Sequence, residues 1–136
     1  MTIEDLISNY TSWIREQTSF RKLDDWYEIN TPFLNHNNDV IQIYAKKING
    51  TVELSDGGDT LNELSLSGVS IEQSSKRTKE FQTILNGFGI DTKGTELVAV
   101  ATEETFAEVK HRLVQAIMSV DDMFLLAKPR IESFFL

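Results

Sequence analysis

The first residues of the chain alternate apolar and polar side chains at the spacing of a helix. The apolar members recur every three or four positions and form one stripe: Ile3, Leu6, Ile7, Tyr10, Trp13 and Ile14. Thr2 is suited to cap such a helix, and two acids, Glu4 and Asp5, fall in its first turn, where the helix dipole favours negative charge. The pattern predicts a helix over residues 3–17.

The next segment changes to a β pattern. The stretch from Leu23 to Phe33 is rich in aromatic and branched side chains and predicts one strand. Pro32 cannot donate a hydrogen bond to a sheet. We therefore expect this strand to stop near Thr31 or to run at a sheet edge there.

A hairpin is the clearest local signal in the chain. Residues 40–47 and 51–55 alternate in the manner of strands and meet at Asn49-Gly50. This dipeptide favours a type I′ turn, in which both central residues have positive φ. A hairpin centred there pairs residues whose numbers sum to about 99, so that Tyr44 lies opposite Ser55.

The second half of the chain predicts helices around another hairpin. Asp59 or Thr60 is suited to cap a short helix that stops at Gly68, and Ser74 or Ser75 a helix that ends at residues 87–89. Residues 90–101 form the second hairpin. After Thr102, the expected cap, helical spacing continues to residue 128, and the aromatic side chains at core spacing are Trp13, Trp26, Phe106 and Phe124.

This order of elements predicts an α+β fold. We expect an antiparallel sheet of about five strands, two hairpins plus one strand, covered by helices in the order α-β-β-β-α-α-β-β-α. Residues 1–136 are enough for a single domain with its own core. The apolar end Phe134-Phe135-Leu136 leaves open that the chain is the N-terminal module of a longer protein.

Composition and charge narrow the classes of function. The 21 acids and 13 bases give a net charge of −8, which disfavours direct binding to nucleic acid. Cysteine is absent, which excludes disulfides, thiolate zinc sites and a cysteine nucleophile and fits a reducing compartment. The sequence predicts neither a signal peptide nor a membrane span, so we expect a cytoplasmic protein.

The acids are concentrated in the middle of the chain. No base falls between Lys47 and Lys76, and the pairing of the first hairpin places Asp39 at the same end of the sheet as Asp56 and Asp59. We call the expected binding surface the acidic rim; its residues are Asp39, Glu53, Asp56, Asp59 and Glu63. The simpler alternative is that these acids serve turns, a helix cap and a solvated surface.

The acidic rim allows two interpretations, one with a bound metal ion and one without a cofactor. In one reading Asp39, Asp56 and Asp59 hold magnesium or calcium, cations that prefer oxygen ligands. The other reading has no cofactor. The two histidines, His36 and His111, have no spacing that pairs them, and no nuclease motif, P-loop or nucleophile elbow is intact, so no catalytic residue is predicted.

Several stretches together resemble a known family. They are Trp26 with Thr31-Pro32-Phe33-Leu34, Asn38-Asp39 before Ile41-Gln42-Ile43-Tyr44, Leu54-Ser55-Asp56 with Gly58 and Thr60, and residues 83–89. The chain resembles the bacterial and prophage family called domain of unknown function 1828, although Gly57 stands where members carry a second acid. The resemblance implies firmicute bacteria, phages or mobile elements, sometimes a further C-terminal domain, and no known activity.

Two functions remain as hypotheses. In the first, this is a small acidic cytosolic protein of phage or mobile-element type that binds another protein, as yet unidentified, without catalysis. One form of this hypothesis has its carboxylates imitate DNA phosphates in a basic site, so that binding weakens with salt. The alternative is a metal-dependent hydrolase or a degenerate nuclease-like domain that uses Asp39, Asp56 and Asp59. The oligomeric state is left open.

Overall fold

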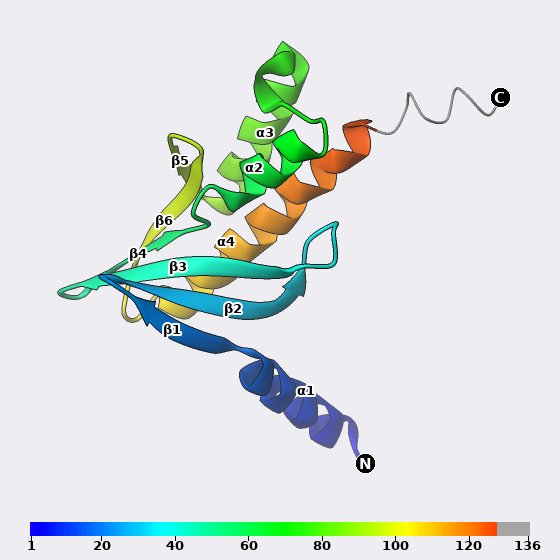
Figure 1. Ribbon diagram of the computed structural model, residues 1–136. Coiled ribbons are helices and arrows are strands. Elements are labelled where there is room, and N and C mark those ends of the chain that lie inside the picture. The colour runs from blue at the N-terminus through cyan, green and yellow to red at the C-terminus, as the bar shows by residue number, and fades with distance from the viewer. Residues whose placement is uncertain (128–136) are drawn as a thin grey trace.

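The computed structural model describes residues 1–127, which form an α+β fold (Figure 1). Its helices and strands follow one another as α1 (Ile3–Gln17), β1 (Ser19–Leu23), β2 (Trp26–Leu34), β3 (Val40–Ile48), β4 (Thr51–Ser55), α2 (Asp59–Leu66), α3 (Ser75–Phe88), β5 (Asp91–Lys93), β6 (Glu96–Thr102) and α4 (Phe106–Asp121). Two short 3₁₀ helices are η1 (Ile71–Gln73) and η2 (Asp122–Ala127). Within this part of the chain, no helix has both the length and the apolar character needed to cross a bilayer.

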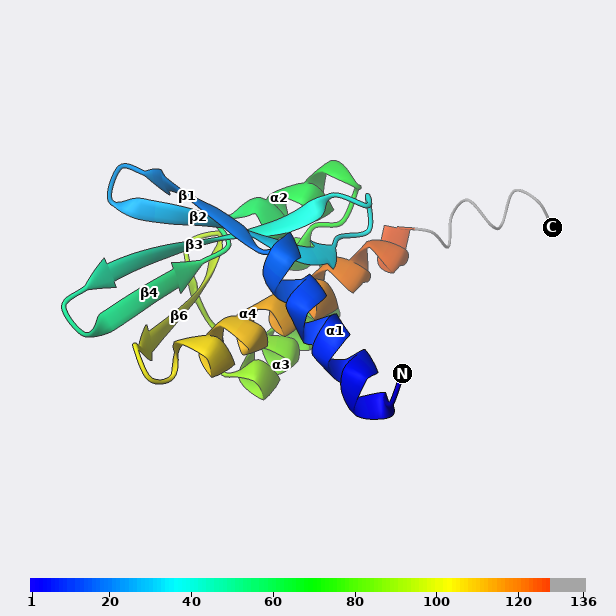
Figure 2. The same ribbon diagram turned by 90° about the horizontal axis from the view of Figure 1, so that it is seen from below.

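The strands of residues 1–127 form one antiparallel sheet of six, in the order β1-β2-β3-β4-β6-β5. Figure 2 shows the strands from β1 to β6 fanned side by side in this order. Because β6 pairs with β4, the hairpin formed by β5 and β6 extends the sheet formed by β1 to β4. The sequence did not predict this strand order. Neighbouring strands are consecutive along the chain from β1 to β4, and the last two positions are taken by β6 and then β5.

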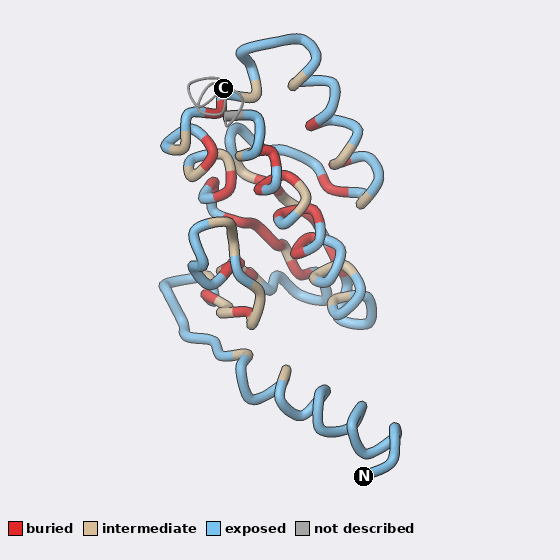
Figure 3. The backbone as a smooth tube through the Cα atoms, turned by 90° about the vertical axis from the view of Figure 1, so that its right-hand side faces the viewer, coloured by how far each residue is buried: buried red, intermediate tan, exposed pale blue. Residues whose placement is uncertain are grey.

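Helices α2, α3 and α4 cover one face of the sheet, and the core lies between them and that face (Figures 1 and 3). Alternate residues of β3 and β4, among them Ile43 and Leu54, point into this core. From the helices come Leu64 of α2, Leu85 of α3 and Leu113 of α4, each fully buried. This packing removes large apolar side chains from water and fixes α2 and α4 beside β3 and β4.

Several sequence predictions are confirmed. Helix α1 has the predicted bounds, and Thr2 caps it in a reciprocal pair with Asp5. Tyr44 does lie opposite Ser55 in the first predicted hairpin. The strand with Pro32 continues to Leu34, but beyond Asn30 it has no neighbour on the β1 side, so the proline lies at a sheet edge as predicted.

The prediction of about five strands missed β1, and the predicted order therefore lacked one strand. Strand β1 pairs with β2 along its whole length, and Asp24, with φ 54°, turns the chain between them. All five residues of β1 are exposed, and Arg21 and Lys22 stand at its centre. The strand has no apolar alternation that would signal it, because it packs on no core.

The predicted turn type and two predicted caps were wrong. At Asn49-Gly50 only Asn49 takes a positive φ, of 56°, whereas a type I′ turn has positive φ at both central residues. Helix α2 begins after Gly58, so that Asp59 is its first residue and not its cap. Helix α4 begins after Thr105, whereas Thr102 ends β6 and hydrogen-bonds to Thr105.

The apolar stripe of α1 is not part of the core. No residue of α1 is buried, and the helix leaves the body of the protein on the β1 side (Figure 3). Trp13, which the spacing predicted to be a core residue, is 47% exposed. The last helix, predicted to continue to residue 128, ends instead at Asp121 and is followed by the 3₁₀ helix η2 as far as Ala127. The apolar residues 134–136 lie outside the described residues.

Candidate functional site

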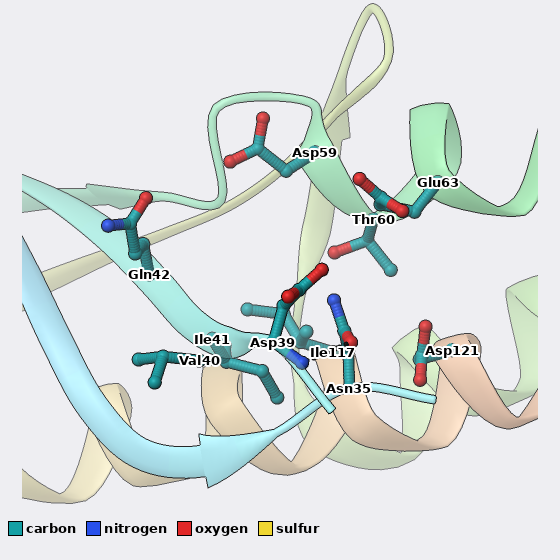
Figure 4. Close-up of a pocket in the computed structure, with 10 residues that line it drawn as sticks. All are labelled: Asn35, Asp39, Val40, Ile41, Gln42, Asp59, Thr60, Glu63, Ile117 and Asp121. Atoms are coloured by element: carbon teal, nitrogen blue, oxygen red, sulfur yellow. Dashed lines mark hydrogen bonds between the residues drawn. The ribbon is translucent and has the colours of Figure 1, made fainter. Parts of the chain in front are cut away.

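The candidate site lies where β4 leaves its neighbour β3. The pairing of these strands ends with Tyr44 opposite Ser55, so β3 from Gln42 back to Val40 has a free edge on this side. A cavity of about 180 Å³ fills the gap between this edge and helices α2 and α4. Figure 4 shows the residues that line it: Asn35, Asp39, Val40, Ile41, Gln42, Asp59, Thr60, Glu63, Ile117 and Asp121.

Three residues of the predicted acidic rim share this pocket. Asp39 lies in the loop immediately before β3, Asp59 and Glu63 come from successive turns of α2, and all three line the pocket (Figure 4). The hairpin register brings Asp39 to the side on which α2 begins. Glu53 does not join them, because it lies within β4 between Lys46 and Val100.

Asp56 has a different place from the other rim residues. Its side chain is buried at 1% exposure and accepts hydrogen bonds from the backbone N–H groups of Gly58, Thr60 and Leu97, at 2.8, 3.2 and 2.9 Å. These bonds join the first turn of α2 to β6. The carboxylate is thus directed at the backbone and does not line the pocket.

The turn that follows Asp56 depends on glycine. Gly57 and Gly58 both take positive φ, 71° and 83°, which residues with a side chain rarely adopt. A Cβ on Gly57 would also lie 2.7 Å from Cε2 of Tyr44. A residue with a side chain at position 57 would therefore need both a rare backbone conformation and a shift of the Tyr44 ring.

The electrostatics of the pocket are dominated by acids. Partial burial raises the pKa of Asp59 above its ordinary value of 3.8, and the negative charges of Asp56, Glu63 and Glu28 raise it further. Neither lysine nor arginine is among the lining residues. The ionised form of Asp59 is consequently disfavoured, and a cation in the pocket would stabilise it.

The carboxylates do not form a ready metal site. Within residues 1–127 no three side chains of His, Cys, Asp or Glu lie close enough together to hold a metal ion. Asp39 and Asp59 line the pocket, but Asp56 turns away from it to the backbone. The magnesium or calcium alternative thus has no assembled ligand set in this part of the chain.

His36, which the sequence predicted to lie in a polar turn, is held near the pocket by several side-chain contacts. Nδ1 of His36 lies 2.8 Å from Oδ1 of Asp121, and its Nε2 lies 2.9 Å from Oγ of Ser67. The backbone N–H of His36 donates to Oδ2 of Asp121 at 2.7 Å, and the ring stacks on Phe124 at 4.4 Å. One signal was available in the sequence: Asp121 falls on the apolar stripe of the last helix, where a buried acid needs a partner.

The order Ser67–His36–Asp121 is that of a hydrolytic triad, but the surroundings of Ser67 oppose acyl transfer. A triad needs backbone N–H groups that are free to stabilise an oxyanion. The N–H groups of Ser67, Gly68 and Val69 all donate instead to carbonyls of α2. Ser67 also stands at the C-terminal end of α2, where the helix dipole disfavours negative charge. The three side chains therefore tie the β2–β3 loop to α2 and α4.

This tie positions the loop that supplies two pocket residues. Within the loop, Oδ1 of Asn35 accepts from the N–H groups of Asn37 and Asp39, at 2.9 and 3.1 Å. Nδ2 of Asn37 donates to Oε2 of Glu63 at 3.0 Å. The loop, α2 and α4 thus hold one another around the pocket.

We expect Asp56→Ala to lower the free energy of unfolding by about 3–5 kcal/mol, because three buried N–H groups lose their acceptor. Urea denaturation followed by circular dichroism measures this change. The matched control is Asp39→Ala, an exposed acid of the same rim, for which we expect a change within about 0.5 kcal/mol. A loss below about 1 kcal/mol for Asp56→Ala would contradict the bracing role of this carboxylate.

We expect a fluorophosphonate probe to leave Ser67 unmodified after prolonged incubation, because the N–H groups of Ser67, Gly68 and Val69 already donate to carbonyls of α2. Intact-mass spectrometry of the protein measures the adduct, with Ser67→Ala as the control. A stoichiometric adduct on Ser67 that disappears in His36→Gln would show that the triad is reactive and that our structural interpretation is wrong.

Most of the chain matches a known protein family. Residues 31–120 match the family described as Domain of unknown function DUF1828. None of the curated proteins and none of the solved structures matches the chain. The matched segment begins at Thr31 in β2 and ends at Val120 in α4, so it contains His36, Ser67 and most of the pocket, but not α1 or β1.

Proposed function

This chain belongs to the DUF1828 family, and from the geometry of its pocket we propose that it acts by binding another protein, without catalysis. The observation that carries the proposal is that Asp39, Asp59 and Glu63 all line one pocket whose lining includes no lysine or arginine. A surface of this kind favours a positively charged ligand. We propose that the ligand is a basic side chain of a partner protein.

The size of the pocket supports a side chain rather than a small-molecule substrate. Its volume of about 180 Å³ is below the roughly 300–1,000 Å³ of pockets that enclose small-molecule ligands. The carboxylates are joined by the side-chain amides of Asn35 and Gln42. An arginine guanidinium has planar donors that match several carboxylate oxygens at once, so we propose arginine ahead of lysine.

The electrostatic surroundings of Asp59 give a second line of support. The raised pKa of Asp59 means that folding disfavours its negative charge, both by burial and by nearby acids. Charged side chains that lower the stability of the fold are typical of binding sites. A partner's cation would offset the repulsion between Asp59 and Glu63.

The wider setting of the proposal follows from composition. The net charge of −8 would attract a basic partner over a distance, and one form of the proposal is that the carboxylates occupy a basic site that otherwise binds nucleic acid. We further propose that the protein is cytoplasmic, which the absence of cysteine supports, and that it is of phage or mobile-element type, which the family resemblance implies. On this proposal its association with the partner weakens as salt concentration rises.

We expect Asp59→Asn to raise the melting temperature at neutral pH and to leave it unchanged at pH well below 3.8. The folded-state pKa of Asp59 is raised, so the wild type keeps its full stability only while this carboxyl is protonated and loses stability as pH rises through the folded-state pKa. Thermal denaturation across pH measures the difference. The control is Glu53→Gln, which removes the same charge outside the pocket; an equal gain there would contradict a local effect.

We expect N-acetyl-arginine amide to bind the pocket with roughly millimolar affinity and N-acetyl-glutamine amide not to bind. NMR titration measures this through the amide shifts of Asp39, Thr60 and Glu63. Neutralising the three pocket acids together (Asp39→Asn, Asp59→Asn, Glu63→Gln) should abolish the shifts, whereas Glu53→Gln should keep them. Equal shifts with the neutral ligand, or shifts that persist in the triple variant, would contradict the proposal.

A further inference from the structure

Helix α1 presents an apolar surface that its own chain does not cover. The stripe predicted from the sequence is present, and its members Ile3, Leu6, Ile7, Tyr10 and Trp13 are all exposed. At 15 residues the helix is near the length at which an isolated helix is only marginally stable in water. Its capping box fixes the first turn but leaves the stripe in contact with water.

The stripe continues onto the edge of the sheet. A shallow hollow at the C-terminal end of α1 is lined by Trp13 and Gln17 together with Pro32, Leu34 and Val40 of the sheet. Leu34 and Val40 are exposed apolar residues that lie opposite each other in β2 and β3. One apolar patch therefore runs along α1 and ends at these two strands; we call it the α1 patch.

The extent of the α1 patch is that of an interface. Its seven large apolar residues, the five of the stripe with Leu34 and Val40, are each 47–70% exposed. Taking about 200 Å² for a large side chain, the patch offers on the order of 700–800 Å². This exceeds the largest apolar patch of a typical monomer, about 300–600 Å², and approaches the roughly 800 Å² that each partner buries in a standard interface.

The charges beside the stripe indicate what covers it. Glu4 and Arg15 are eleven positions apart, close to three helical turns, so they lie along the same edge of the stripe at opposite ends. Within residues 1–127 neither side chain has an ion-pair partner. An identical helix packed antiparallel would bring Glu4 beside Arg15 of the second copy, and the two-fold axis would repeat the pair.

We propose that a second copy of this chain covers the α1 patch, with the two α1 helices packed antiparallel about a two-fold axis. The midpoint of the stripe, between Ile7 and Tyr10, then lies at the axis. Ile3 of each copy packs near Ile14 of the other and next to the sheet edge formed by Leu34 and Val40. The antiparallel arrangement also opposes the two helix dipoles. This interface needs none of the pocket's acids, although Val40 borders both surfaces.

Sedimentation analysis of the full chain tests the association. We expect a mass of twice the 15.5 kDa of one chain at high micromolar concentration. Leu6→Glu with Tyr10→Glu should give a monomer whose core retains a cooperative thermal transition. The matched control, Ser8→Glu with Ser12→Glu, adds two charges to the polar face of α1 and should remain dimeric. A monomeric wild type, or a dimer that survives charges in the stripe, would overturn the proposal.

Cysteine cross-linking tests the orientation of the pair. The chain contains no cysteine, so every disulfide must come from an introduced residue. A mixture of Ile3→Cys and Ile14→Cys chains should form a mixed disulfide, whereas each variant alone should form little, and Ser8→Cys on the polar face should form none. Efficient disulfides in Ile3→Cys alone would show a parallel pair and overturn the antiparallel arrangement.

Discussion

The buried carboxylate of Asp56 is the interaction on which the arrangement of the site depends. Asp56 follows the last residue of β4, and its carboxylate accepts hydrogen bonds from the backbone N–H groups of Gly58 in the turn, Thr60 in α2 and Leu97 in β6. An aspartate can satisfy three such donors without a counter-charge, because each bond places a backbone dipole against its negative charge. The direction of α2, and hence the position of Asp59 and Glu63, follows from this one side chain.

The pocket exists because the sheet is uneven. Strand β3 is longer than β4, so that its residues before Tyr44 have no partner in β4. On that side, side chains of α2 and α4 lie opposite β3 in place of another strand. The structure closes one side of this gap with the tie between His36 and Asp121. A loop that supplies Asn35 and Asp39 is thereby held by two buried partners, which is the kind of preorganisation that a binding site requires.

Much of the fold could be predicted from the sequence where local and tertiary preferences agree. Asn49-Gly50 and the alternation around it were sufficient to pair Tyr44 with Ser55, and that pairing brought Asp39 to the side of Asp59. Strand β1 could not be predicted from periodicity, because neither of its faces is buried. Its position is determined by the ladder with β2, which is a tertiary effect.

The candidate site was predictable only in part, for a related reason. An acid in a turn either accepts hydrogen bonds from the backbone or is exposed to solvent, and sequence spacing does not distinguish the two cases. Asp56 accepts from the backbone, whereas Asp59 lines the pocket. The role of His36 depends on Asp121, 85 residues further along the chain. Contacts over such a separation leave no local pattern, apart from an acid in an apolar stripe.

Val40 is common to the two surfaces considered above. It lines the acidic pocket on one side and the hollow at the end of α1 on the other. Two ligands that meet at one residue are thermodynamically linked: if occupation of one surface shifts this residue, each ligand changes the other's affinity by the same factor. The start of β3 would then serve as the point through which self-association and partner binding regulate each other.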